Sequence, residues 1–111
     1  MKPLKKRADF LRLRRGAKAG TLAFLLVRRF RDDGRAEVRV GLTVTKKLGG
    51  AVFRNHIRRR LRAAVREVFP EHAEAGADYV LVARRSAYTR KYAALLDDMK
   101  RALLSLRRKT G

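Results

Sequence analysis

Between positions 38 and 45, hydrophobic residues alternate with small or polar ones, which is the period of a β-strand with one buried face. The hydrophobic positions are Val38, Val40, Leu42 and Val44. The intervening positions form a small, polar face that lets a ligand backbone approach: Arg39, Gly41, Thr43 and Thr45. Hydrophobic runs at 21–30 and 79–83 predict two more buried strands, and the Asp-Gly chemistry of 31–35 predicts a turn after the first run.

Helical spacing occurs near both ends of the chain. Asp9 is placed to cap a short helix that Gly16 ends, with Phe10 and Leu13 on its apolar side. Near the C-terminus, hydrophobic residues recur at helical intervals, which predicts a helix whose apolar side faces the core. Its members are Tyr92, Leu95, Leu96, Met99, Leu103 and Leu106.

The elements after the first short helix follow the order strand, strand, helix, strand, helix. No long linker, repeat or low-complexity block divides residues 1–111. We therefore predict a single α+β domain (an α/β sandwich), in which a mixed sheet of about four strands is backed by helices. The strand–helix–strand unit from Val38 to Ala83 predicts that its two strands are parallel neighbours.

The predicted central helix carries the densest positive charge. It should begin after the Gly49-Gly50 pair, which breaks the preceding strand, and end before Pro70. One arc of this helix, roughly 140° wide at about 100° per residue, holds Arg54, Asn55, Arg58, Arg59 and Arg62. A second, apolar arc holds Phe53, Ile57, Leu61, Ala64, Val65 and Val68.

The cationic arc is suited to phosphate groups, because a guanidinium stays charged and offers phosphate two parallel donors. An ordinary solvated helix is the alternative, but such helices usually mix both signs, and no carboxylate occurs from Phe53 to Arg66. The net charge of +20, from 30 Lys and Arg against 10 Asp and Glu, also indicates a polyanionic partner. A hydrophobic content of 46% indicates a folded globule instead of a disordered basic tail.

Composition disfavours membrane and secreted classes. No apolar stretch approaches the roughly 18 residues of a membrane span, and no lipidation signal is present, so no membrane partner is predicted. The first ten residues, MKPLKKRADF, lack the apolar middle of a secretory signal, which makes the cytoplasm the expected location. The absence of cysteine excludes disulfides and thiolate metal sites.

No catalytic or metal-binding constellation is evident among the polar residues. A two-metal nuclease needs several converging carboxylates, whereas Asp32-Asp33 is expected in a turn and Asp97-Asp98 on the polar side of the last helix. His56 and His72 are the only imidazoles, and no hydroxyl is set up as a nucleophile. The sequence therefore predicts a binding protein with no catalytic residue, metal site or cofactor of its own.

The pattern of aromatic and polar residues favours RNA as the bound polyanion. Phe10 lies on a short helix rich in Lys and Arg, where an exposed ring could stack on a base. Packing of this ring onto the sheet is the alternative, and most other aromatic residues are expected in the core. No helix-turn-helix, zinc-finger or basic-zipper pattern is present, and a small polar strand face beside a basic helix suits single-stranded or structured RNA.

An ordered set of motifs covers nearly the whole chain. Residues 39–49, RVGLTVTKKLG, are followed by Ala51-Val52, Arg54-Asn55 and Arg58-Arg59, with Leu4-Lys5-Lys6 and Asp9-Phe10 upstream and 79–84, YVLVAR, downstream. This set resembles the protein subunit of bacterial ribonuclease P. Three positions depart from the family pattern: Gly50 replaces the usual asparagine, His56 replaces arginine or lysine, and Arg14 replaces a second aromatic of many relatives.

The resemblance implies that the RNA subunit, with Mg²⁺, is the catalyst that removes the 5′ leader of precursor transfer RNA. The protein would be its accessory partner, a monomer bound one-to-one to the RNA. The residues implied in docking on the catalytic RNA are Lys46, Arg54, Asn55, Arg58 and Arg59. The residues implied in a cleft for the single-stranded leader are Phe10, Thr43, Thr45, Lys47 and Arg62. The family fold also implies a left-handed crossover between parallel strands, against a rule that is about 98% right-handed.

Two other functions stay open on composition alone. One is a structural or ribosomal RNA-binding protein with no role in processing. The other is a small endonuclease, which would hydrolyse RNA without any partner.

Overall fold

The structure is a computed structural model that describes residues 1–109. Its strands are β1 (Lys2–Pro3), β2 (Ala17–Gly20), β3 (Phe24–Phe30), β4 (Arg39–Thr43) and β5 (Ala77–Ala83). Its α-helices are α1 (Arg7–Arg12), α2 (Ala51–His72) and α3 (Tyr92–Arg107). Three short 3₁₀ helices connect them: η1 (Leu13–Arg15), η2 (Lys46–Leu48) and η3 (Arg85–Tyr88).

The strands form one mixed sheet in the order β1-β4-β5-β3-β2. β4 is parallel to both β1 and β5, whereas β3 is antiparallel to β5 and β2. The parallel pairing of β4 with β5 confirms the expectation for the strand–helix–strand unit. The sheet has five strands instead of about four, because the two edge strands are too short to show a period in the sequence. The left-handed sense of the crossover stays a prediction.

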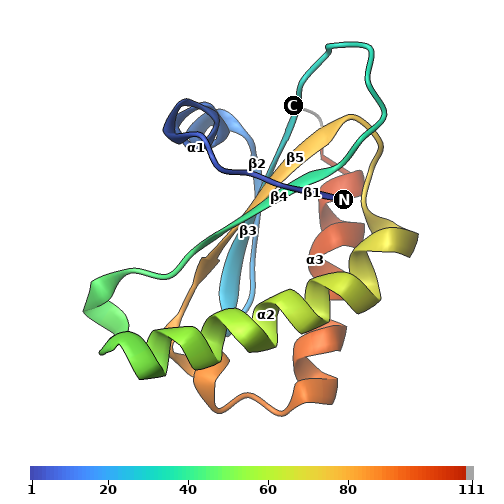
Figure 1. Ribbon diagram of the computed structural model, residues 1–111. Helices are drawn as coiled ribbons and strands as arrows, with labels where there is room; N and C mark the ends of the chain where they lie inside the picture. Colours follow the sequence, from blue (N-terminus) through green and yellow to red (C-terminus); the bar gives the residue numbers. More distant parts are fainter. Residues whose placement is uncertain (110–111) are drawn as a thin grey trace.

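Helices cover both faces of this sheet (Figure 1). α2 and α3 pack on one face and enclose the larger core, whose fully buried members include Phe24, Ile57, Leu61, Phe69, Leu81, Leu95 and Leu103. On the opposite face, α1 and η1 cover a smaller core formed by Leu4, Leu13, Val27 and Val80, with Phe10, Leu25 and Val82 packed against it. The alternation along β4 and β5 divides these side chains between the two cores.

Several predicted element boundaries were wrong. The strand predicted at 38–45 spans only Arg39–Thr43, and three other differences have a local reason. Asp9 lies inside α1 with Lys6 as the N-cap, because its buried carboxylate pairs with arginines instead of capping the helix. Pro70 lies inside α2, where a proline in the last turn removes one backbone hydrogen bond while buried Phe69 keeps that turn on the core. The strand predicted at 21–30 begins only at Phe24, because the Thr21 hydroxyl accepts hydrogen bonds from the next backbone amides and forms a turn.

Several side chains also differ from their expected burial. Asp98 is 4% exposed instead of lying on the polar side of α3, because it accepts hydrogen bonds from Arg90 and Arg101. Tyr92, expected in the core, is exposed at the first residue of α3, where its hydroxyl donates to Glu67 at 3.2 Å. The remaining apolar side of α3 is buried or partly buried as expected.

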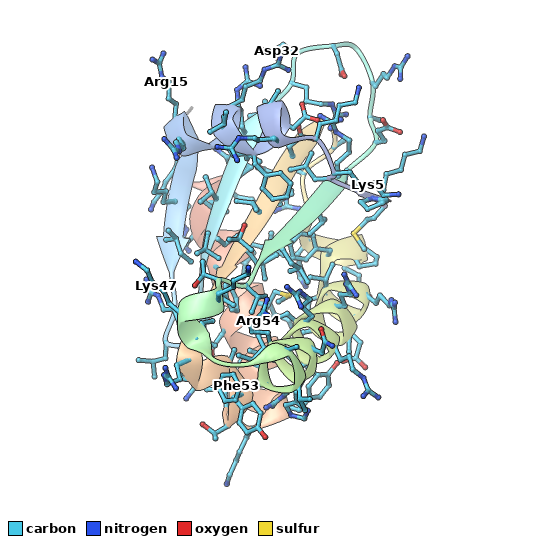
Figure 2. All side chains as sticks on the ribbon, turned by 60° about the vertical axis from the view of Figure 1, so that its left-hand side comes forward. Lys5, Arg15, Asp32, Lys47, Phe53 and Arg54 are labelled. Carbon is cyan, nitrogen blue, oxygen red and sulfur yellow. The ribbon has the colours of Figure 1, made fainter. Side chains whose placement is uncertain are left out.

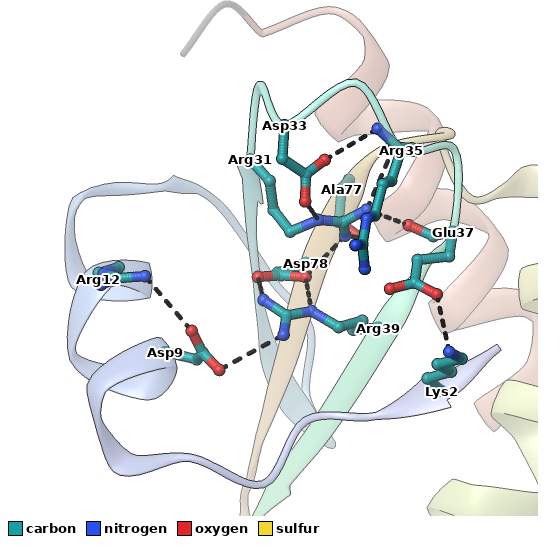
Figure 3. Close-up of polar contacts among 10 residues, drawn as sticks. All are labelled: Lys2, Asp9, Arg12, Arg31, Asp33, Arg35, Glu37, Arg39, Ala77 and Asp78. Atoms are coloured by element: carbon teal, nitrogen blue, oxygen red, sulfur yellow. Dashed lines mark hydrogen bonds and ion pairs between the residues drawn. The ribbon is translucent and has the colours of Figure 1, made fainter.

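A buried ionic network around Asp78 joins one end of the sheet to α1 (Figure 3). Asp78, on β5, accepts hydrogen bonds from Arg39 at 2.6 and 2.8 Å and from Arg31 at 2.9 Å. Arg39, on β4, also lies 3.5 Å from the carboxylate of Asp9 on α1. Arg31 donates further to the carbonyl of Glu37, which fixes the loop between β3 and β4.

The environment of Asp78 favours its ionised form. Burial by itself raises the pKa of this carboxyl, but the hydrogen bonds and charges of Arg39 and Arg31 outweigh burial, so the pKa lies below its ordinary value of 3.8. The pairing therefore contributes stability to the folded protein wherever the carboxylate is ionised.

We predict that Asp78→Asn lowers the free energy of unfolding by about 3–5 kcal/mol at neutral pH, because it leaves two arginines without their shared carboxylate. A group with a lowered pKa in the folded state contributes stability above its unfolded pKa, and that contribution disappears as pH falls through the folded pKa. The difference between wild type and variant should therefore shrink in acid, below pH 3.8. Urea denaturation at neutral and acidic pH measures both effects.

Asp33→Asn is the matched control, because Asp33 also pairs with Arg31, at 2.9 Å, but lies in an exposed turn. Exposed ion pairs contribute about 0–1 kcal/mol. A loss as large as that of Asp78→Asn would contradict the special role of the buried carboxylate.

Candidate RNA interface

The cationic arc of α2 lies on the solvent side of the helix, as the periodicity predicts. Asn55, Arg59 and Arg62 are exposed, Arg54 and Arg58 are half-buried, and the apolar arc faces the larger core. The Arg58 guanidinium donates to the Asn55 side-chain oxygen at 2.9 Å, and Arg54 donates through Nε to the carbonyl of Gly49 at 3.2 Å. These two contacts hold both guanidinium groups against the helix surface, ready for a ligand.

The loop before α2 extends this arc. Lys46 and Lys47 lie in η2 and are exposed, and Figure 2 shows Lys47, Phe53 and Arg54 at the N-terminal end of α2. Gly49 permits the connection, because its φ of +156° disfavours other residues and a Cβ there would lie 3.0 Å from the Phe53 ring. We call the surface formed by the five predicted docking residues the docking face; its members are Lys46, Arg54, Asn55, Arg58 and Arg59.

Arg60 is different from the other arginines of α2. Its guanidinium donates to the carbonyl oxygens of Ala87 at 3.2 Å, Tyr88 at 2.8 Å and Arg90. Arg60 therefore fixes the η3 segment against α2 instead of facing solvent. In the sequence, this role was indicated only by the position of Arg60 on the helix, which lies outside the cationic arc.

A cavity of about 410 Å³ lies between α1 and the sheet, on the face opposite α2. Its apolar lining includes Phe10, Leu13, Val27 and Val80, and the residues Arg7, Arg14 and Lys18 add positive charge to it. The Phe10 ring is half-buried and approaches Gly41 so closely that a Cβ there would lie 2.6 Å from Phe10 Cζ. The ring therefore packs on the sheet, as one interpretation predicted, and it also lines an open cavity, while stacking on a base stays a prediction.

Two of the five residues predicted for the cleft lie together in this cavity, namely Phe10 and Thr43. Thr45 and Lys47 lie beyond the end of β4, at and inside η2, and do not line it. Arg62 lies on α2, across the sheet from Phe10, and continues the docking face instead. Arg14, already noted as a departure from the family pattern, lines the cavity from η1. Sequence reasoning missed Arg7 and Lys18, which line it because α1 and β2 border it.

The charges of these two surfaces are not neutralised by carboxylates of the described residues. Six of the ten carboxylates form ion pairs elsewhere: Asp9, Asp33, Glu37, Glu74, Asp78 and Asp98. Their partners are mostly arginines that hold the fold together, such as fully buried Arg28, which donates to Glu74 at 2.8 Å. No ion pair within residues 1–109 involves the docking face, so its charge is available to an external anion.

The described part of the chain contains no group of three or more His, Asp or Glu side chains arranged to hold a metal ion. Over the same residues, no helix is both long enough and apolar enough to cross a membrane.

Comparison with known proteins gives a consistent result. The family model described as Ribonuclease P matches residues 1–107. The ribonuclease P protein component of Caulobacter vibrioides is 50% identical over 103 residues, which cover 93% of this chain and 69% of the relative. That of Ruegeria pomeroyi is 47% identical over 105 residues, covering 93% and 84%.

Solved structures show the same likeness. A ribonuclease P protein from Staphylococcus aureus matches with a TM-score of 0.78 and 27% identity, covering 97% of this chain and 96% of that one. The ribonuclease P protein from Thermotoga maritima matches with a TM-score of 0.77 over 100% of both chains, and at 24% identity it supports the fold alone.

Because the docking face has no internal counterions, we predict that multivalent anions bind and stabilise the folded protein. Sulfate or phosphate at millimolar concentration should raise the melting temperature more than chloride at matched ionic strength. The double variant Arg58→Ala/Arg59→Ala should lose part of this difference. Equal shifts with all anions would indicate plain screening of charge instead of organised binding.

Proposed function

Because the chain belongs to the ribonuclease P protein family, in which it has the role of accessory protein subunit, we propose that its two cationic surfaces bind different RNAs. The docking face binds the catalytic RNA, and the cavity beside Phe10 binds the 5′ leader of precursor transfer RNA. The phosphodiester chemistry belongs to the RNA subunit and its Mg²⁺, and one protein assembles with one RNA in the cytoplasm. Every relative quoted above is a ribonuclease P protein, which gives no support to a structural or ribosomal role.

The observation that carries this division is the separation of two unlike surfaces by the sheet. The docking face is a rigid helix with arginines fixed at regular spacing, which suits the phosphates of a folded RNA. The cavity combines an aromatic ring and an apolar lining with neighbouring cations, which suits unpaired nucleotides. A single ligand on one surface would not require both chemistries.

The geometry of β4 supports the assignment of the cavity to a single strand. Gly41 lets the Phe10 ring lie directly on the strand, and Thr43 offers a hydroxyl two residues further along the same face. Arg14 lines the cavity where many relatives have an aromatic residue. A cation at this place makes leader binding more sensitive to salt and less dependent on base identity.

We predict that the purified chain restores leader cleavage by a ribonuclease P RNA at low magnesium concentration. We also predict that Arg58→Ala/Arg59→Ala weakens assembly of the protein with the RNA subunit by about 2 kcal/mol or more. Both guanidinium groups lie outside the core, so the variant should keep the melting temperature of the wild type in chloride. Affinity for the RNA subunit and cleavage of a leader-bearing precursor are the measurements.

Cleavage by the chain alone, without an RNA subunit, would contradict the proposed role. If the double variant assembled normally, the RNA subunit would have to bind a surface other than the docking face. Lys100→Ala/Arg108→Ala is the matched control, since it removes two exposed cations in or directly after α3, outside the docking face, that form no ion pair within residues 1–109.

For the cavity, we predict that Phe10→Ala weakens binding of precursor transfer RNA by about 1–3 kcal/mol, the usual contribution of a base stacked on an aromatic ring. Binding of mature transfer RNA, which has no leader, and assembly with the RNA subunit should not change. The measurement compares both ligands with holoenzymes that contain wild-type or variant protein.

Gly41→Ala provides an independent test of the same cavity, because its Cβ would displace the Phe10 ring without removing it. We expect the same selective loss for precursor. Equal losses on precursor and mature transfer RNA, or a large fall in melting temperature with both variants, would show that Phe10 acts only in packing.

A further inference from the structure

An aromatic ridge formed by Phe53, His56 and Tyr88 borders the docking face. Phe53 and His56 lie three residues apart on α2, and Tyr88 is the last residue of η3. The Phe53 and Tyr88 rings are stacked, with centroids 4.3 Å apart and planes within 9° of parallel. The His56 ring lies 4.7 Å from Tyr88 at a tilt of 52°. The first turns of α2 and the η3 segment, 32 to 35 residues apart in sequence, are thus joined through contacts between aromatic rings.

The ridge is not a closed part of the core. Tyr88 is 39% exposed, His56 is exposed, and Phe53 is only half-buried. The two segments that supply these rings contain no carboxylate, from Phe53 to Arg66 and from Tyr79 to Leu96. Exposed aromatic rings in surroundings of uniform positive charge are the combination that binds unpaired nucleotides.

The ridge is also held in a fixed position before any ligand binds. Arg60 donates to the carbonyl oxygens of Ala87 and Tyr88, and Ala87 itself is fully buried. The Arg85 guanidinium lies 5.8 Å from the Phe53 ring and adds a cation beside the stack. A base that binds here therefore meets rings that need little further ordering, which favours affinity.

We propose that the aromatic ridge stacks an unpaired base of the RNA subunit, with Tyr88 and His56 as the contact residues. This inference rests on the proposed function of the docking face. His56 and Arg59 lie three residues apart on α2, which makes them surface neighbours, so a nucleotide with its phosphate on Arg59 can place its base on the ridge. The leader is a less suitable ligand, because its cavity lies on the other face of the sheet.

The chain contains no tryptophan, so Tyr88→Trp introduces a single fluorescent reporter into the ridge. We expect its emission to be quenched when the variant assembles with a ribonuclease P RNA, because a base stacks on the indole. Tyr92→Trp is the matched control, since Tyr92 has similar exposure, 36% against 39%, but lies at the start of α3 beside Glu67. Its emission should change little.

The affinity of Tyr88 variants for the RNA subunit provides a second test. Tyr88→Leu keeps an apolar contact with Phe53 but removes the ring, and it should weaken assembly about tenfold, within the range expected for one stacked base. The dependence on salt should keep the wild-type slope, because no phosphate contact is removed. Tyr88→Phe should assemble like the wild type.

The outcomes separate this proposal from the function on which it rests. If the wild-type protein does not assemble with the RNA subunit, the proposed function of the docking face is wrong. If Tyr88→Trp assembles normally with unchanged emission, or Tyr88→Leu assembles with wild-type affinity, the ridge is only a packing contact. Quenching by precursor transfer RNA alone, but not by the RNA subunit, would assign the ridge to the substrate and overturn the proposal.

Discussion

The pairing of one buried carboxylate with two arginines holds the three central strands of the sheet together and ties them to α1. Asp78 on β5 holds Arg39 of the neighbouring strand and Arg31 at the end of β3, so three central elements of the sheet meet at one charge. Arg39 extends the contact to Asp9 and thereby sets α1 over the sheet. The width of the cavity beside Phe10 follows from this placement, because α1 is short and has a small core beneath it. An electrostatic contact beneath α1 thus helps to position the residues that line this cavity.

The many cations of this protein have two different roles. Buried or half-buried arginines, such as Arg28, Arg39 and Arg60, donate to carboxylates or backbone carbonyls and act as cross-links between elements. Most of the carboxylates are used in such contacts. The exposed cations of α2 and η2 therefore keep their full charge, and the free protein carries a repulsion that binding to a polyanion relieves.

The two surfaces also differ in how firmly they are built. The docking face stands on a helix of 22 residues whose apolar side packs on the larger core. The cavity beside Phe10 is covered by a helix of six residues and a 3₁₀ turn. A rigid surface suits a permanent partner with a fixed shape, whereas a lightly covered cavity suits segments of varied sequence. The same sheet supports both, because its alternating side chains supply a separate core to each face.

The sequence by itself determined the features that depend on local periodicity. The arcs of α2 predicted its buried and exposed faces correctly, because burial repeats with the geometry of a helix. The alternation of 38–45 correctly placed its hydrophobic residues on the larger core, but the opposite face is covered too, with Gly41 buried under Phe10. The parallel pairing of β4 and β5 followed from the intervening helix. The ordered motifs of 39–59 identified the family, since they combine backbone requirements with side-chain chemistry.

Tertiary structure decided which of these residues meet. Thr43 and Thr45 share a face of the alternating pattern, yet only Thr43 lines the cavity, because β4 ends at Thr43 and the chain turns into η2. Asp9 was predicted to cap a helix and Asp98 to lie on a polar helix side, but both are buried in ion pairs, with Arg39 and Arg90 respectively. In the aromatic ridge, Phe53 of α2 and Tyr88 of η3 stack on each other although they are distant in sequence. Local patterns carry no record of such contacts, because they depend on how elements distant in sequence pack in three dimensions.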